Sequence, residues 1–118
     1  MRLVLALSCA LICASATAEW RQFKGNTAVL EIDFSSIIGT KAHSTFSLRI
    51  RPNELRSAPG GTYDRIEGVG EMDCTSKRWR MIRSERWLGE RQVWTSGGNG
   101  TPWSQLSDDF AAMQAVCD

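Results

Sequence analysis

The residues best suited to bind a ligand lie in the segment 77–91, which has a local excess of four positive charges. Two tryptophans, Trp79 and Trp87, are interleaved with the basic side chains. Alternate residues of an extended strand share a face, which predicts Arg78, Arg80 and Arg86 on one face and the two tryptophans on the other. Arginine and aromatic side chains in this arrangement bind acidic proteins, sulfated sugars or single-stranded nucleic acid. We take these five residues as the candidate ligand face.

A purely structural interpretation of the same segment stays open beside this one. Glu67, Glu71 and Asp73 alternate along the preceding extended segment and could attract a cation, but they are better placed to form cross-strand ion pairs with the arginines. In that case Trp79 and Trp87 pack beneath a helix and the basic segment binds nothing.

Catalytic chemistry finds little support in the sequence. The one histidine, His43, has no orienting carboxylate at a suitable spacing. The glycine-rich stretches 60–61 and 97–100 contain no lysine and do not lead from a strand into a helix, so they are not phosphate-binding loops. Asp108 and Asp109 fit the positive end of a helix dipole better than acid–base work. We therefore expect no enzyme, no catalytic residue, no cofactor and no metal site.

The first eighteen residues have the layout of a secretory signal peptide. Arg2 precedes an apolar run over 3–13 that is too short to span a bilayer, and Ala16 and Ala18 are small residues before a predicted cleavage site after Ala18. We expect a signal peptide over 1–18 and a single domain over 19–118. Cys13 follows Ile12, which is too large for a lipidation motif, so a lipid anchor is not expected.

The predicted mature chain narrows the function classes further. Cleavage removes one of the 14 basic residues and none of the 13 acidic ones, which leaves a neutral chain. A neutral chain has no bulk attraction for nucleic acid, and no later apolar stretch is long enough to cross a membrane. The protein is thus expected in the periplasm or the extracellular medium, with no membrane span and no nucleic-acid partner.

Two cysteines, Cys74 and Cys117, remain in the predicted mature chain. Exported proteins mature in oxidising compartments, so we expect these two residues to form a disulfide. A loop of this length would stabilise the fold by about 3 to 4 kcal/mol. The alternative is a pair of free thiols or half of a metal site, although only His43 could join them as a further ligand.

The elements expected around these residues are short strands followed by one helix. The segment 44–51 gives the clearest strand, because apolar and polar residues alternate along it. Further strands are expected over 20–23, 28–33, 62–74, 77–87 and 91–95, with 57–61 as a loop and 62–74 and 77–87 as a hairpin. Gly68 and Gly70 predict a bulge or a close approach by another part of the chain.

The last segment changes from strand to helix periodicity. Leu106, Phe110, Met113 and Cys117 would form one stripe of a helix, with Ser107 as its cap. The stripe would place Cys117 against the sheet, where a bond to Cys74 could clamp the helix. The predicted fold is α+β: an antiparallel sheet of about six strands with one C-terminal helix packed on a face.

Several pieces of the mature chain, in this order, resemble the surface-adhesin protein E family of exported bacterial proteins. They are the segment 31–37, the strand through Phe46 and Arg49, the pair Tyr63-Asp64, Asp73-Cys74 followed by Arg80, then Trp87, Trp103 and the ending Val116-Cys117. The resemblance implies a curved six-stranded sheet, a Cys74–Cys117 disulfide and a tendency to form homodimers. It also implies a non-enzymatic adhesin that binds host extracellular proteins. The alternative is a periplasmic or secreted protein that docks on another envelope protein as an inhibitor or stability factor.

Overall fold

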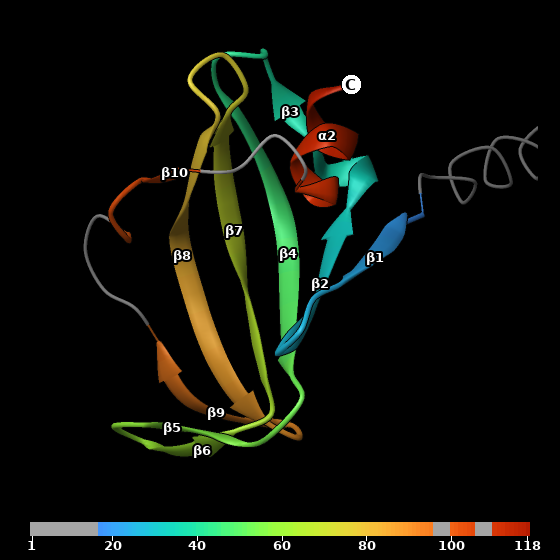
Figure 1. Cartoon of the computed structure of the whole chain (residues 1–118). Coiled ribbons are helices and arrows are strands. Elements are labelled where there is room, and N and C mark those ends of the chain that lie inside the picture. The colour runs from blue at the N-terminus through green and yellow to red at the C-terminus, as the bar shows by residue number, and fades with distance from the viewer. Residues whose placement is uncertain (1–16, 96–99, 106–109) are drawn as a thin grey trace, which may run out of the picture.

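The computed structural model of the chain describes residues 17–95, 100–105 and 110–118. Within these ranges an eight-stranded antiparallel sheet dominates the fold (Figure 1). Its strands are β1 (Trp20–Lys24), β2 (Ala28–Asp33), β3 (Ile38–Gly39), β4 (Ser44–Pro52), β7 (Arg65–Asp73), β8 (Arg78–Leu88), β9 (Arg91–Thr95) and β10 (Ser104–Gln105). A separate hairpin contains β5 (Arg56–Ala58) and β6 (Gly61–Tyr63), and two short helices are η1 (Phe34–Ser36) and α2 (Ala111–Cys117).

The strands run in the order β1-β2-β4-β7-β8, β9 and β10 both pair with β8, and β3 pairs with β4. The predicted number of about six strands is therefore too low. The strands β3 and β10 have two residues each, which is too short to show a periodic pattern. The predicted loop 57–61 contributes to the hairpin of β5 and β6, and the predicted strand 62–74 breaks at Asp64. The 62–74 and 77–87 hairpin is confirmed as the pair of β7 and β8.

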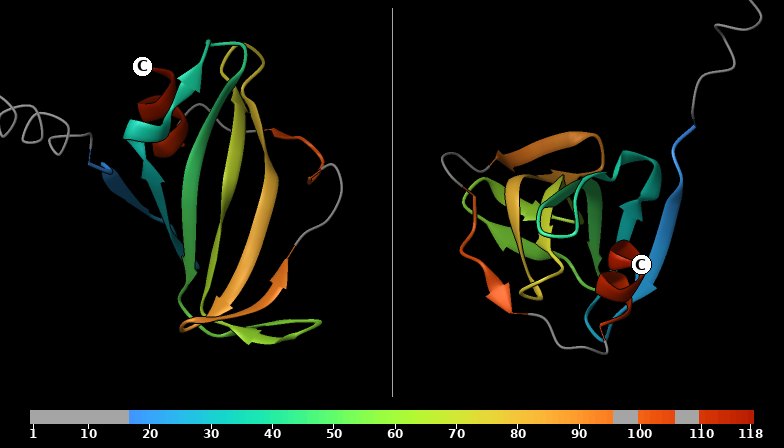
Figure 2. Two further views of the ribbon diagram at one scale, coloured as in Figure 1. Left: turned by 180° about the vertical axis from the view of Figure 1, so that it is seen from behind. Right: turned by 90° about the horizontal axis from the view of Figure 1, so that it is seen from above.

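One face of the sheet forms the core together with α2, and we call it the helix face. Alternation along β4 buries Phe46 and Leu48 on this face, next to Ile32 of β2 and Met72 of β7. Ala112 of α2 packs into the same cluster and is 1% exposed. The view from above shows α2 lying on one side of the sheet (Figure 2). The predicted two-layer arrangement of a sheet and a C-terminal helix is thus correct.

The predicted bulge and close approach both occur at the glycines of β7. The pairing of β7 with β8 shifts register between Val69 and Gly70. A Cβ atom on Gly70 would lie 2.7 Å from Cε2 of Phe46 and 2.8 Å from Cδ2 of Leu48. Core side chains therefore occupy the space beside Gly70, and only glycine fits there without a shift of these neighbours.

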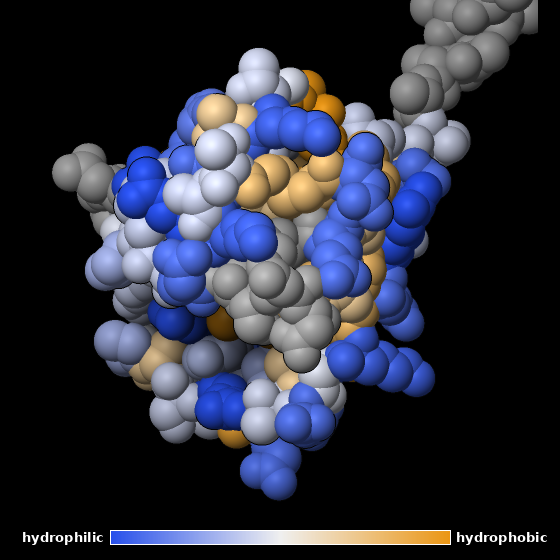
Figure 3. All heavy atoms as spheres, turned by 45° about the horizontal axis from the view of Figure 1, so that its top comes forward, coloured by the Kyte–Doolittle hydropathy of each residue, from blue (hydrophilic) through white to orange (hydrophobic). Residues whose placement is uncertain are grey.

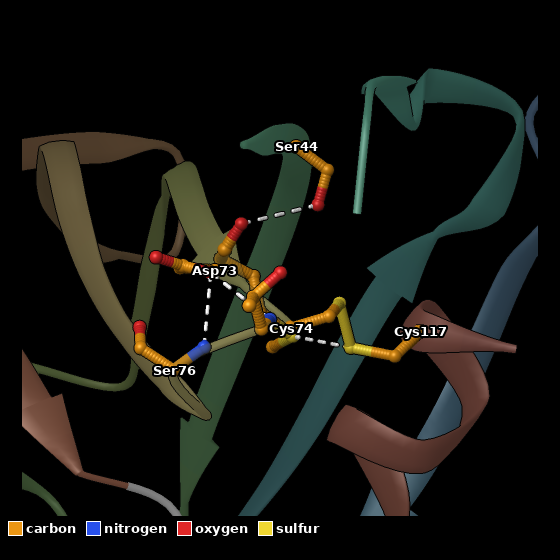
Figure 4. Close-up of a disulfide and its surroundings, with 7 residues drawn as sticks. Ser44, Asp73, Cys74, Ser76 and Cys117 are labelled. Carbon is orange, nitrogen blue, oxygen red and sulfur yellow. Dashed lines mark hydrogen bonds between the residues drawn. A yellow bond between two sulfur atoms is a disulfide. The ribbon is translucent and has the colours of Figure 1, made fainter. Parts of the chain in front are cut away.

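The Cys74–Cys117 disulfide is present, and it joins the end of β7 to the end of α2 (Figure 4). Its Cα atoms are 5.7 Å apart, which is an ordinary spacing for a disulfide. Cys74 directly follows Asp73, whose carboxylate accepts hydrogen bonds from the backbone N–H groups of Thr75 and Ser76 in the β7–β8 turn. The disulfide thus ties α2 to the turn of the β7–β8 hairpin.

The helix itself is shorter than predicted. Phe110 is its N-cap, has an extended backbone and makes no side-chain capping hydrogen bond, and its side chain is 37% exposed instead of belonging to a buried stripe. Among the described side chains of α2, Ala112 is the buried one. The predicted residues 106–109, which include the Ser107 cap and the two aspartates, lie outside the described residues, as does the side chain of Met113.

The N-terminal end of the described chain is tied to η1. The backbone nitrogen of Glu19 donates to Oδ1 of Asp33 at 2.8 Å, and the backbone nitrogen of Phe34 donates to the carbonyl of Glu19 at 2.8 Å. Asp33 also caps η1 through the backbone N–H of Ser35.

In the described residues no helix is long and apolar enough to cross a membrane. On the face seen in Figure 3, hydrophobic residues gather in patches between hydrophilic ones.

Candidate binding face

The predicted division of β8, with the three arginines on one face and the two tryptophans on the other, is wrong in part. Val69 pairs with Arg83 while the next residue, Gly70, pairs with Met81, so Ile82 is an extra residue in β8. An extra residue reverses the alternation of side chains beyond it. Arg86 therefore lies on the helix face, opposite to Arg78 and Arg80, and the expectation that the three share a face is wrong.

The tryptophans are separated by the same bulge. Trp79 pairs with Met72 on the helix face and packs against the core, as the structural interpretation of the segment requires. Trp87 pairs with Arg65 on the opposite side of the sheet, which we call the outer face. The Arg65 guanidinium lies 5.3 Å from the centre of the Trp87 ring. Of the five predicted residues, Arg78, Arg80 and Trp87 thus lie on the outer face.

On the outer face, a residue outside that prediction completes the cluster. Pairing of β10 with β8 sets Ser104 opposite Trp79, which places the preceding residue, Trp103, beside Arg80. The Arg78 and Arg80 guanidiniums lie 4.5 Å and 4.7 Å from the centre of the Trp103 ring. We call these three residues the Arg–Trp–Arg patch. The sequence pointed to Trp103 only through the family resemblance, because the two-residue strand β10 that follows it is too short to show a periodic pattern.

Carboxylates of β7 hold the two arginines of the patch. Glu71 Oε1 accepts a hydrogen bond from Arg80 Nε at 2.8 Å, and Asp73 Oδ2 lies 3.8 Å from Arg78 Nε. These two cross-strand ion pairs agree with the structural interpretation. Glu67 departs from it, because Glu67 lies opposite Glu85 and forms its ion pair with Arg65 of its own strand at 2.7 Å.

Glu71 is the buried centre of this cluster, with 5% of its surface exposed. Burial raises the pKa of Glu71, but hydrogen bonds from Arg80 and His43 outweigh that effect and hold the pKa below its ordinary value of 4.5. His43, which contacts Glu71 through Nε2, is mostly exposed and lies just before β4. The sequence spacing indicated no carboxylate for His43, and the structure supplies one, because strand pairing sets Glu71 opposite Thr45 of β4.

The patch combines an exposed surface with locally balanced charge. The side chains of Arg78 and Arg80 remain 44% and 30% exposed while two carboxylates neutralise them. A neutral cluster of this kind suits a protein surface better than a polyanion, which needs a net positive field. Within 17–95, 100–105 and 110–118, no three histidine, cysteine or carboxylate side chains gather closely enough to hold a metal ion.

Comparison with known proteins adds no assignment to this geometry. No family model matches the chain. No curated protein matches it significantly either.

Proposed function

We propose that this chain is an exported, non-enzymatic binding protein of the surface-adhesin protein E kind, which contacts a protein ligand through the Arg–Trp–Arg patch. The observation that supports the proposal most is the contact of the Trp103 ring with the guanidiniums of two partly exposed arginines, Arg78 and Arg80. Tryptophan and arginine are the residues most enriched among those that dominate binding energy at protein interfaces. Because Glu71 and Asp73 already hold the arginines, little side-chain freedom is lost when a partner binds.

The Cys74–Cys117 disulfide supports export, because structural disulfides form and persist in oxidising compartments. The expected partner is an extracellular protein of a host, in keeping with the family resemblance. Glu71 and Asp73 balance the charges of the two arginines in the patch. Binding should therefore depend on contact and stacking more than on long-range attraction. Raising the salt concentration should therefore weaken binding only slightly.

Binding of the mature chain to immobilised matrix glycoproteins tests the proposal. The Trp103→Ala variant should bind roughly 10-fold to 30-fold more weakly, as expected when a central interface residue is truncated. The matched control is Arg83→Ala, because Arg83 is 64% exposed on the same face but is not stacked on a tryptophan. Equal unfolding curves for the two variants would show that the loss reflects contact and not folding.

Two results would remove the adhesive part of the proposal. One is a mature protein that binds no matrix glycoprotein at low salt. The other is a Trp103→Ala variant that binds as well as the Arg83→Ala control. Crosslinking in cells from a photoreactive residue at position 83, which is exposed on the same face and leaves Trp103 in place, distinguishes the alternative partner, because capture of one envelope protein would indicate docking within the bacterial envelope instead.

A further inference from the structure

Arg86 has surroundings unlike those of the other arginines in β8. Its guanidinium lies 4.2 Å from the centre of the Trp94 ring and 5.1 Å from the centre of the Tyr63 ring. Trp94 is its direct partner in β9, and Tyr63 belongs to the β5–β6 hairpin, which packs over this end of the helix face. Tyr63 is 8% exposed and Trp94 is half-buried, so the guanidinium contacts one buried ring and one partly exposed ring. A cation positioned in this way is already oriented for a ligand.

In the described part of the chain, no carboxylate lies within ion-pair distance of Arg86. Arg78, Arg80 and Arg83 of the same strand each have one. Arg86 Nε is shut off from solvent and has no hydrogen-bond acceptor. Leaving a buried donor of a charged group without an acceptor is costly, so such donors usually have a role. The carboxylate of Asp64, which follows Tyr63, accepts a hydrogen bond at Oδ2 from the backbone nitrogen of Gly89, while its Oδ1 lies 3.7 Å from Arg65 and is buried without a hydrogen-bond partner.

A second arginine lies on the same face close to Arg86. Arg91 pairs with Leu88, which alternates onto the same face as Arg86. One of its terminal nitrogens lies 3.9 Å from the position that a Cβ atom on Gly61 would occupy, so Arg91 reaches the β5–β6 hairpin. Because Leu88 lies two residues beyond Arg86 in β8, Arg86 and Arg91 are neighbours across the strands β8 and β9. Arg91 also forms no ion pair with any carboxylate that the structure describes.

We propose that Arg86, flanked by Tyr63 and Trp94 and joined by Arg91, binds an oxyanion group between the β5–β6 hairpin and the strands β8 and β9. The ligand class is a small molecule or side chain that presents a carboxylate, phosphate or sulfate. Arginine donates parallel hydrogen bonds to such groups, and the flanking rings prevent the guanidinium from turning away. This site is on the opposite face from the Arg–Trp–Arg patch, so its success or failure does not depend on the proposed function.

Titration of the isotope-labelled mature protein with sodium phosphate, sulfate and acetate tests the site by NMR. Chloride keeps the ionic strength constant. The side-chain Nε–H signal of Arg86 and the indole N–H signal of Trp94 should shift and saturate together. Arg86→Met keeps the length of the side chain and removes the charge, so it should weaken binding roughly tenfold or more. The control Arg83→Met, on the outer face, should leave the affinity unchanged.

The comparison of anions identifies the ligand chemistry. A tighter response to phosphate and sulfate points to an ester of these acids, whereas a tighter response to acetate points to a carboxylate, and both results support the site. The site would be overturned by chemical shifts that change linearly with the concentration of all three anions, without saturating. It would also be overturned by shifts of the Trp94 signal that are the same in Arg86→Met as in the wild type. If Arg86→Met does not fold, Arg91→Met serves in its place, because Arg91 is exposed, and unchanged binding in that variant would likewise overturn the proposed pair.

Discussion

Replacing both Cys74 and Cys117 with serine should lower the free energy of unfolding by about 4 kcal/mol. The two residues are 43 positions apart, and closing a loop of this length reduces the entropy of the unfolded chain by about 13 cal/mol/K, which corresponds to about 4 kcal/mol near room temperature. The double variant avoids a single unpaired thiol. The melting temperature should fall by roughly 4–8 °C for each kcal/mol that is lost.

The same perturbation should release α2 specifically. The helix has seven residues, which is too short for a stable isolated helix, and among its described side chains the fully buried one is the small methyl group of Ala112. Amide hydrogen exchange should therefore lose protection in α2 before it does so in β4 and β7. Reducing the wild-type protein with a phosphine should reproduce both effects without any change of sequence.

Two results would refute this reasoning. One is a loss below about 1 kcal/mol in urea unfolding, which would mean that the closed loop adds little beyond the packing. The other is unchanged protection of α2 in the double variant, which would mean that Ala112 and its neighbours hold the helix without the bond. If the measured mass of the wild-type protein did not show the loss of two hydrogens, the disulfide on which this prediction depends would be absent.

Three further predictions concern the core, acid stability and processing. Gly70→Ala should cost about 1–3 kcal/mol in urea unfolding, because the new Cβ would press on Phe46, and Gly68→Ala should cost more, because its Cβ would lie 2.1 Å from the backbone carbonyl of Arg83. The folded pKa of Glu71 is below its ordinary value of 4.5, so its contribution to stability is complete above that value and is lost as the pH falls toward the folded pKa. Unfolding curves between about pH 6 and about pH 3 should therefore show a smaller acid loss in Glu71→Gln than in the wild type; an equal loss would contradict this. Intact-mass analysis of the exported protein should give a chain that begins at Glu19, and a mass that includes residues 1–18 or a lipid would contradict the predicted processing.

The sequence predicted strands well where one face of the strand is buried and the other is exposed to solvent. The strand expected over 44–51 is β4, Ser44–Pro52, because the burial of Phe46 and Leu48 requires a regular alternation that the residue types display. The cysteine pair was predictable for a different reason, since only two cysteines follow the predicted signal peptide. In both cases a single physical requirement leaves one solution.

The candidate face was only half predictable, because its geometry depends on a bulge. The run Arg80-Met81-Ile82-Arg83 fits either register, since each choice places one apolar residue inward, and the pairing with Gly70 decides between them. Trp103 joins the patch through β10, a two-residue strand held by hydrogen bonds such as that from Gln105 to the carbonyl of Ser76. Such long-range contacts leave no local signal in a sequence.

The hydrogen bond between the backbone nitrogen of Glu19 and Asp33 gains a new meaning if processing follows Ala18. Cleavage there would turn this nitrogen into the terminal ammonium group of the mature chain, 2.8 Å from a carboxylate oxygen. An amide hydrogen bond would become a charge-assisted one, which is roughly twice as strong. Removal of the leader would then tighten the first edge strand as well as free the protein, so that the precursor would be the looser of the two forms.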